Sequence, residues 1–585
     1  IYRQNNPTFH NLTDPIFGLD VPGGAGGCGY IPNPLDATSR GTPTCPVQTF
    51  TTGGPGFIYE RSLDRMQARS VATRVLHGAG THVLKFGIDY EYMSYNSNRG
   101  YSGGTLYREN TLATTFSDLR QYSFLSAPDE NNILKNLEWR VYSSTIGGFV
   151  QDSWSIMDKV TLNAGLRYDA QHLFGGDKKL AMALPNQLSP RIGMIFDPTQ
   201  SGHAKLFVNY ARYYQSVPLN LADRSGSGEP SNQSTHFSAG NAPGSVPMNT
   251  PACDPIDPNS TAACRADAGR IIRGDSSTPD QLWIPTGAGK VAVDPKIRAP
   301  STDEVVAGGE LEIIRDARLG VTYSHRWMTR TIEDMSRDEA TTYFIGNPGY
   351  GIARDFPKAQ RVYDAVMLYV DKRFTRNFLV NASYTMAFNR GNLAGLFRPE
   401  TGQLDPNANS TFDLKSLLVN QYGYLPGDTR HSVKLFTAGE IPLTNGHSLT
   451  LGGSFRANSG GPTNALGSHV VYGSDEAYLL PRGTGERLPW QFRIDTNFGY
   501  RKQISKDLAL SITMTIFNVA NFQRVTAVDQ TYTFDDVVPV AGATVSDLAT
   551  LKNNDGALIS KNPNFGKPTA YQQPRMFSFG IRLIF

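Results

Sequence analysis

Residues Arg575–Phe585, with the sequence RMFSFGIRLIF, are the most informative stretch of the chain. Large apolar residues alternate there with small or polar ones. The apolar set is Phe577, Phe579, Ile581, Leu583 and Phe585, and the intervening set is Ser578, Gly580, Arg582 and the apolar exception Ile584. Alternate side chains of a strand point to opposite faces, so this pattern predicts a strand with one apolar face. A soluble domain could end in such a strand, so the rest of the chain must decide its setting.

The same alternation recurs in other long runs. It is clearest in residues 84–91, 160–169, 377–389, 491–498 and 508–516, whereas both faces are apolar around Phe149 and Val150, where no outward face can be assigned. These runs reach roughly 10 residues, the length that a tilted membrane strand needs and about twice that of an average soluble strand. The pattern favours strands that cross a bilayer.

The composition agrees with strands and excludes two other classes of protein. The chain has 585 residues, a net charge of +3 and a mean hydropathy of -0.34. No apolar run is long enough for a transmembrane helix, and no basic stripe suggests nucleic-acid binding. A membrane barrel alternates apolar and polar positions, so its average hydropathy is that of a soluble protein. Glycine (57), tyrosine (27) and phenylalanine (30) suit many turns and aromatic girdles.

Short and long connections alternate along the chain. Short turns are expected near 78–80, 157–159, 199–203, 315–317, 375–376, 442–446 and 504–507. Long irregular connections are expected near 97–138, 217–302, 335–359, 392–428, 460–487 and 523–574, with one of middling length near 175–187. Tight periplasmic turns and long external loops give a membrane barrel this asymmetry, which places the C-terminus on the periplasmic side.

The strand count indicates that part of the barrel lies upstream. About fifteen strands are expected, from roughly 59–77 to 575–585, whereas bacterial single-chain barrels have an even number. Loss of about seven strands would give the 22 strands of large transporters with plugged lumens. We therefore expect residues 1–58 to be the remnant of an extracellular loop, residues 59–585 to be the later part of the barrel, and the sheet to be incompletely closed.

The four cysteines form two local pairs in loop sequence. Cys28 is near Cys45, and Cys253 is near Cys264, with no histidine at zinc-ligand spacing. Two disulfides that staple extracellular loops are the preferred interpretation, and four unrelated thiols are the alternative.

An ordered set of short motifs resembles the barrel of TonB-dependent outer-membrane receptors, and in particular their Oar-like subgroup. The motifs are residues 148–154 (GFVQDSW), 162–169 (LNAGLRYD), 189–193 (SPRIG), 363–365 (YDA) with 372–374 (KRF), 382–385 (ASYT), 428–431 (DTRH), 458–462 (NSGGP) and 517–521 (FNVAN). The resemblance runs from about residue 59 to the end and implies energised uptake of a solute. The family's plug domain and TonB box are not found in this sequence, and they are expected upstream.

Charged residues at the polar positions of the strands are the candidate site. Charges facing lipid cost a few kcal/mol near the midplane, so these side chains are expected to face the lumen. They would contact a plug or line a solute path, or simply solvate the wall. The candidates are Lys85, Asp89, Arg167, Asp169, Glu310, Glu312, Lys434, Glu440, Arg493, Asp495 and Arg582.

No catalytic or metal-binding motif is evident. The glycine-rich stretch 23–27 lacks the lysine and serine or threonine of a phosphate-binding loop. Asp254 and Asp257 could bind calcium but lack the spacing of a calcium loop, and Asp529, Asp535 and Asp536 are interpreted as solvated loop residues. Loop aromatics such as Tyr343, Phe344 and Tyr350 could stack on a ligand, but loop packing or an interface girdle is the favoured interpretation for most of them.

The sequence therefore predicts an all-β transmembrane barrel in the outer membrane of a Gram-negative-type bacterium, without enzymatic activity or cofactor. The resemblance implies three partners besides lipid: an inner-membrane TonB complex acting through the plug, an unidentified solute, and the barrel assembly machinery acting on the C-terminal strand. A passive channel and an adhesion or assembly protein anchored by its barrel are the alternatives.

Overall fold

The computed structural model describes most of the chain from residue 57 onward. The described ranges are 57–101, 136–176, 178–219, 221–222, 291–339, 342–375, 377–401 and 410–585, together with short strands in the intervening segments and before residue 57. Cys28, Cys45, Cys253, Cys264, Asp254 and Asp257 lie outside the described residues, so both disulfides stay predictions.

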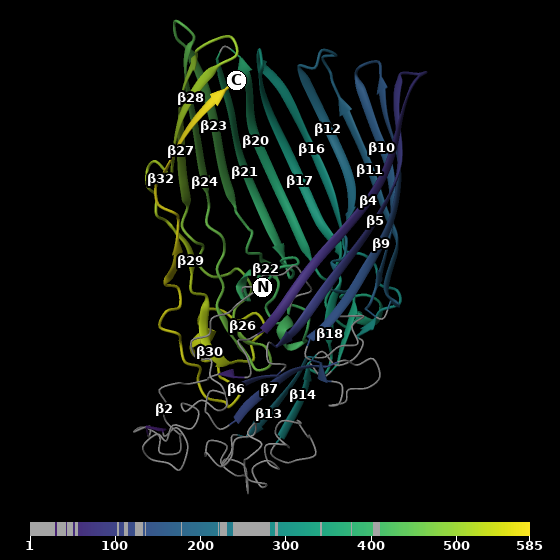
Figure 1. Ribbon diagram of the computed structural model, residues 1–585, viewed down its shortest axis with the longest axis vertical. Coiled ribbons are helices and arrows are strands. Elements are labelled where there is room, and N and C mark those ends of the chain that lie inside the picture. The colour runs from purple at the N-terminus through teal and green to yellow at the C-terminus, as the bar shows by residue number, and fades with distance from the viewer. Residues whose placement is uncertain are drawn as a thin grey trace.

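One antiparallel sheet dominates the fold (Figure 1). It has 16 strands, of which β22 (Gly423–Tyr424) only extends the pairing of β21, and the others follow one another in chain order. These are β4 (Phe57–His77), β5 (Thr81–Tyr101), β9 (Asn136–Ile156), β10 (Val160–Phe174), β11 (Leu180–Phe196), β12 (Ala204–Tyr214), β16 (Ser301–Ile314), β17 (Ala317–Arg330), β20 (Arg361–Thr375), β21 (Phe378–Gly391), β23 (His431–Pro442), β24 (His447–Asn458), β27 (Gln491–Gln503), β28 (Ala509–Phe517) and β32 (Met576–Ile584). Their number and limits confirm the predicted strands.

Tight turns gather at one end of the sheet and long connections at the other (Figure 1). Every predicted short turn is confirmed, including the turn 315–316 between β16 and β17, in which Asp316 adopts a φ of 66°. The C-terminus lies at the turn end, as predicted (Figure 1). All long connections therefore leave the barrel on the same side.

The prediction of a middling loop at 175–187 is wrong. β11 begins at Leu180, so residues 175–179 form the whole connection, closed by a hydrogen bond from Gly175 N to Lys179 O of 3.0 Å. Pro185 and Asn186 read as turn residues, but they form a bulge within β11, where Asn186 has a φ of 65°. A bulge admits a proline and a left-handed residue inside a strand because the ladder is interrupted there.

The long connections are not irregular, which corrects a second prediction. They contain small sheets, short 3₁₀ helices and buried apolar clusters. Their elements are β1 (Tyr30–Ile31), β2 (Thr42–Pro43), β3 (Thr51–Thr52), β6 (Thr105–Glu109), β7 (Thr115–Tyr122), β8 (Ile133–Leu134), β13 (Ser231–Phe237), β14 (Gln281–Thr286), β15 (Ala292–Val293), β18 (Glu333–Ser336), β19 (Tyr343–Gly346), η2 (Gly351–Ala353), η3 (Pro399–Thr401), η4 (Ser416–Leu418), β25 (Leu466–His469), β26 (Gly473–Tyr478), β29 (Val525–Val528), β30 (Thr531–Asp536), η5 (Asp547–Ala549) and β31 (Pro568–Tyr571).

The sheet order ends at β4 on one side and at β32 on the other, and no register pairs these two strands among the described residues. That a larger, closed barrel includes further strands stays a prediction. No helix in the described part of the chain is long and apolar enough to cross a membrane.

Candidate lumen wall and extracellular cap

The charged candidates all lie on one face of the large sheet. Residues directly opposite in neighbouring antiparallel strands share a face, and so do residues two apart in one strand. Asp89 and Asp169 are each directly opposite Gly147 on the neighbouring strand. From β12 to β27, a second row of directly opposite positions includes Lys205, Glu310, Tyr369, Lys434 and Arg493. Lys85, Arg167, Glu312, Glu440, Asp495 and Arg582 follow from the same alternation.

The opposite face carries the exposed apolar side chains. Phe86, Ile88, Leu166, Leu319 and Leu368 lie there, each more than two-fifths exposed. The structure also settles the apolar run in β9. Val150 lies on this apolar face, whereas Phe149 lies on the polar face against Gly87. A barrel in a membrane turns its apolar band to lipid, so the polar face is the candidate lumen wall.

Aromatic side chains mark both borders of the apolar band. Near the loop end, Tyr384, His431 and Trp490 stack in sequence, with ring centroids 6.1 and 5.8 Å apart. Near the turn end, the Tyr500 hydroxyl lies 2.5 Å from His447 Nδ1. Trp490 and Tyr500 are ten residues apart, which spans roughly 34 Å along the strand and roughly 25 Å across the membrane at the usual tilt. The aromatic residues therefore form two girdles at a bilayer's spacing.

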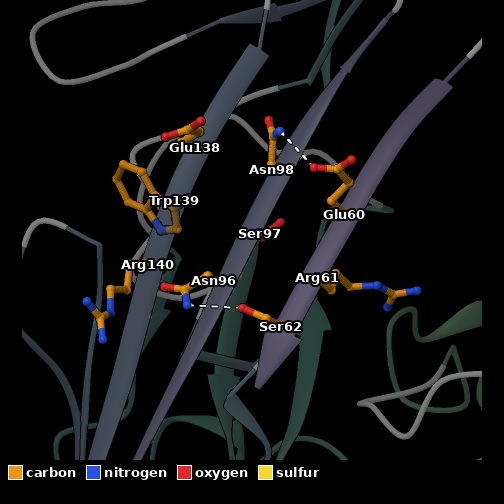
Figure 2. Close-up of a pocket in the computed structure, with 9 residues that line it drawn as sticks. All are labelled: Glu60, Arg61, Ser62, Asn96, Ser97, Asn98, Glu138, Trp139 and Arg140. Carbon is orange, nitrogen blue, oxygen red and sulfur yellow. Dashed lines mark hydrogen bonds between the residues drawn. The ribbon is translucent and has the colours of Figure 1, made fainter. Parts of the chain in front are cut away.

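A groove of about 570 Å³ lies beyond the outer girdle, at the loop ends of β4, β5 and β9 (Figure 2). Two hydrogen bonds join side chains that line it. Asn96 Nδ2 donates to Ser62 Oγ at 3.1 Å, and Asn98 Nδ2 donates to Glu60 Oε2 at 3.4 Å, as Figure 2 shows. These polar pairs lie on the same face of the sheet as Ile88, which belongs to the apolar band. Because this face turns polar toward the loop ends, the strands continue beyond the membrane.

The lumen wall of β5, β9 and β10 carries a three-residue ion-pair cluster. The Arg167 guanidinium donates to Asp89 at 2.8 Å and to Asp169 at 2.6 and 2.7 Å. Gly147 lies directly between the two aspartates in the register. A Cβ atom at Gly147 would collide with both carboxylates and with the guanidinium. The glycine therefore makes the room in which one cation meets both carboxylates.

A second neutralised cluster lies around Glu310. Its carboxylate accepts a hydrogen bond from the Tyr369 hydroxyl at 2.6 Å and lies 3.2 Å from Lys205 Nζ and 3.8 Å from Arg318. Gly320 lies between Glu310 and Tyr369 in the register, and a Cβ atom there would collide with the tyrosine ring. Lys205, Tyr369 and both glycines are not among the residues that the sequence predicts for the site, because only the register shows them to be neighbours of the candidates.

The remaining candidates differ in how they are satisfied. Arg493 Nε donates to both carboxylate oxygens of Asp495, at 2.8 and 3.0 Å. Glu312 closes the β16–β17 turn by accepting a hydrogen bond from Asp316 N at 3.0 Å. Within the described part of the chain, no ion pair is found for Lys85, Lys434, Glu440 or Arg582. The structure thus brings some candidates together and leaves others to face the lumen singly.

The loop end carries a folded cap held by buried charges. Arg398 is 1 % exposed and pairs with Glu476, which also accepts a hydrogen bond from Ser410 at 2.8 Å. Arg482 is fully buried and donates to the Tyr478 hydroxyl at 2.6 and 2.9 Å, and this hydroxyl in turn donates to Glu400 at 2.7 Å. These bonds join the connection after β21 to the connection after β24, and burial raises the pKa of Tyr478 to about 12.

Other loop residues support the same cap. Phe344 lies in an apolar cluster with Phe356 and Leu393, so it is not available to a ligand. The Tyr343 hydroxyl lies 2.6 Å from that of Tyr472, and Tyr350 packs under Arg330.

The loop aspartates are satisfied within the cap. Asp529 and Asp535 accept hydrogen bonds from Thr531 N and Ser560 N of their own connection, and Asp536 accepts one from Ser468 Oγ of the connection after β24. The described residues contain no group of three or more side chains suited to a metal ion.

Comparisons with known proteins agree with this architecture. Residues 4–182 match the family described as outer membrane beta barrel domain. The chain is 42 % identical over 587 aligned residues to the TonB-dependent transporter Oar of Myxococcus xanthus, covering 96 % of this chain and 54 % of that protein. The crystal structure of the outer membrane transporter YddB from Escherichia coli superposes with a TM-score of 0.50 at 12 % identity, over 92 % of this chain and 56 % of YddB.

The chain thus spans about half the length of its curated relative. The YddB comparison supports the fold alone, because its sequence identity is low. The relationship to Oar extends over nearly the whole chain, and both findings place the protein in the outer membrane of a Gram-negative-type bacterium. The chain is thus similar over nearly its whole length to the TonB-dependent transporter Oar, and the strands described above are part of an outer-membrane β-barrel.

Proposed function

We propose that this barrel belongs to a receptor that binds a solute at its extracellular cap and passes it through the lumen with energy supplied by a TonB complex. The observation that carries the proposal is the 42 % identity, over 96 % of the chain, to a protein named as a TonB-dependent transporter. No covalent chemistry is part of this activity.

The geometry supports passage through a filled lumen. Charged side chains project from one face along the whole width of the sheet. Some of these are neutralised within the wall, as Arg167 and Glu310 are, and others face the lumen without an ion-pair partner among the described residues. Unpaired wall charges suit contact with a plug or a polar solute. Under this proposal a plug lies upstream, and a TonB protein acts on it.

The extracellular cap is the proposed binding surface. Its connections are joined to one another by the buried pairs of Arg398 and Arg482, so the cap presents a defined surface rather than separate loops. A preorganised surface binds with less loss of conformational entropy.

The test is solute uptake by the full-length protein in its own host. Candidate solutes are radiolabelled, and uptake is compared between the wild type, a deletion of this gene and a strain without TonB. We expect uptake of at least one solute to fall in both mutants. Uptake that depends on the gene but not on TonB, together with conductance in liposomes, would establish a passive channel. Loss of surface organisation with unchanged uptake would instead establish an adhesion or assembly protein.

A further inference from the structure

One sector of the lumen wall holds a row of three cations, of which only Arg493 has an acidic partner among the described residues. Lys434 on β23 is directly opposite Arg456 on β24, and Arg456 is directly opposite Arg493 on β27. Directly opposite residues have Cβ atoms roughly 5 Å apart, and like charges in these positions repel each other. Three cations side by side are therefore an arrangement that the sheet alone does not favour.

The same row is neutralised on the other half of the wall. The register continues from Lys434 through Ser383 to Tyr369, Gly320, Glu310 and Lys205, the second neutralised cluster described above. Lys205 thus has an acidic partner at 3.2 Å, whereas no ion pair involves Lys434 or Arg456 among the described residues. The charge imbalance is confined to β23, β24 and β27.

Acidic groups near the row do not remove the imbalance. Asp495 is the next lumen-facing residue below Arg493 and occupies only the Nε of its guanidinium. Glu440 is six residues below Lys434 on the same strand, which is roughly 20 Å away. In the part of the chain that the structure describes, the Arg456 guanidinium lies over the ring of Phe436, 5.4 Å from its centroid, and no hydrogen bond or ion pair is found for it. The outer nitrogens of Arg493 and the whole Lys434 and Arg456 head groups can therefore take an anion.

The wall also leaves room for a ligand beside the row. A cavity of about 190 Å³ borders Arg493, and its lining combines the amide residues Asn518, Gln572 and Gln573 with the apolar residues Phe517, Pro574 and Met576. The layer directly below the row holds Phe436, Ser454 and Asp495, and the layer after it, Ala438, Gly452 and Asn497, is uncharged and has no large side chain. The Asn518 and Gln572 amides already donate to backbone carbonyls, so the donors offered to an anion are the guanidinium and ammonium groups of the row, which carboxylates and phosphates bind strongly.

We propose that Lys434, Arg456 and Arg493 form a binding site on the lumen wall for a carboxylate- or phosphate-bearing solute. The proposal rests on the proposed transport function, because it assigns a chemical class to the solute. A row of cations at one height of the barrel would hold such a solute on the β23–β27 side of the lumen.

The test measures anion binding by the purified full-length protein in detergent, apart from uptake. Citrate and inorganic phosphate are the probes, and chloride at equal ionic strength is the control. We expect both probes to raise the melting temperature of the wild type above its value in chloride. In Lys434→Gln/Arg456→Gln, citrate should bind at least tenfold more weakly in calorimetry, while the melting temperature in chloride stays equal or rises because repulsion is removed.

Lys205→Gln is the matched control, because it removes a cation of the same row that already has a partner. It should bind citrate as the wild type does. Equal citrate affinity in all three proteins, or no response of the wild type to either probe, would overturn the anion site. The wild type would also fail to respond to either probe if an acidic segment of the same polypeptide already filled the site. Because uptake is measured separately, TonB-dependent uptake together with either result would refute this site and leave the proposed function standing.

Discussion

The buried ion pair between Arg398 and Glu476 should control whether the cap stays folded. Arg398 also donates to Ser410 Oγ and, at 3.0 Å, to the Glu476 carbonyl. The substitution Arg398→Met keeps the apolar stem but leaves the Glu476 carboxylate, whose side chain is 10 % exposed, without its cation. Removal of one partner from a buried pair costs about 3–5 kcal/mol, chiefly because the remaining charge stays desolvated.

That cost should appear in the local opening of the cap rather than in the barrel. Two amides report on the cap: Leu479 N donates to Ala465 O at 3.0 Å, and Arg482 N donates to Asn420 O at 2.9 Å. A loss of about 3–5 kcal/mol corresponds to exchange of these amides with solvent that is roughly a hundred to a few thousand times faster. Amides in the ladder between β20 and β21 should be unaffected. Hydrogen exchange read by mass spectrometry of the full-length protein makes this measurement.

An exposed ion pair in the same cap is the matched control. Arg337 pairs with Asp355 at 2.9 Å, but the two side chains are 46 % and 35 % exposed. Solvent screens such a pair, so Arg337→Met should cost about 0.2–1 kcal/mol and accelerate exchange less than tenfold. Equal effects of Arg398→Met and Arg337→Met would refute the reasoning from burial. So would a double variant Arg398→Met/Glu476→Met that is as open as Arg398→Met alone, since removal of both charges should restore part of the loss.

Three further predictions concern the cap, the lipid face and the lumen wall. His469 Nδ1 accepts a hydrogen bond from the Val471 backbone N–H at 3.2 Å, and burial lowers the pKa of this histidine. The histidine therefore stabilises the folded cap above the ordinary pKa of about 6.5, and this stabilisation is lost as the pH falls below that value. Proteolysis of the cap at pH 5 relative to pH 7 should therefore rise more in the wild type than in His469→Gln, and equal pH responses would contradict this. Leu368→Arg on the lipid face should destabilise folding into vesicles by about 2–4 kcal/mol in urea titrations, whereas Thr385→Arg on the lumen face should cost less than about 1 kcal/mol; equal costs would mean the faces are misassigned. A Cβ atom at Gly87 would lie 2.6 Å from the Phe149 ring, so Gly87→Leu should cost about 1–3 kcal/mol in the same titration, and an unchanged midpoint would show that the ring moves aside freely.

The two predicted loop disulfides can be tested by mass spectrometry. Mass mapping of the exported protein under non-reducing conditions should find Cys28 joined to Cys45 and Cys253 joined to Cys264. Free thiols at these positions, or exchanged partners, would contradict the prediction.

The sequence sufficed for the features that depend on local alternation. A period of two residues places Lys434 and Arg493 on the polar face whatever their strands pair with, and the turn residues around Asp316 end one strand and begin the next. Local reasoning failed where a residue's role depends on its neighbour across the sheet. Pro185 and Asn186 look like a loop until the register with β10 shows a bulge.

The cap could not be predicted because its contacts connect distant parts of the chain. Arg398 and Glu476 are 78 residues apart, and each sits in sequence that is polar and rich in turn residues. Such composition predicts exposure, yet both side chains are buried because each supplies the other's hydrogen bonds. The long connections therefore looked irregular in sequence although they fold around their own polar and apolar contacts.

Glycines in the lumen wall decide where opposite charges on neighbouring strands can meet. Gly147 and Gly320 each lie between groups that must meet, and each would block its cluster if it carried a side chain. In the row of Lys434, Arg456 and Arg493 no glycine separates the cations, and no acidic residue stands in the register between them. The wall thus neutralises its charges where a glycine lets opposite groups approach, and it presents them to the lumen where that arrangement is missing. This difference within one sheet is the physical reason to expect that the β23–β27 side, rather than the β5–β10 side, meets an anion.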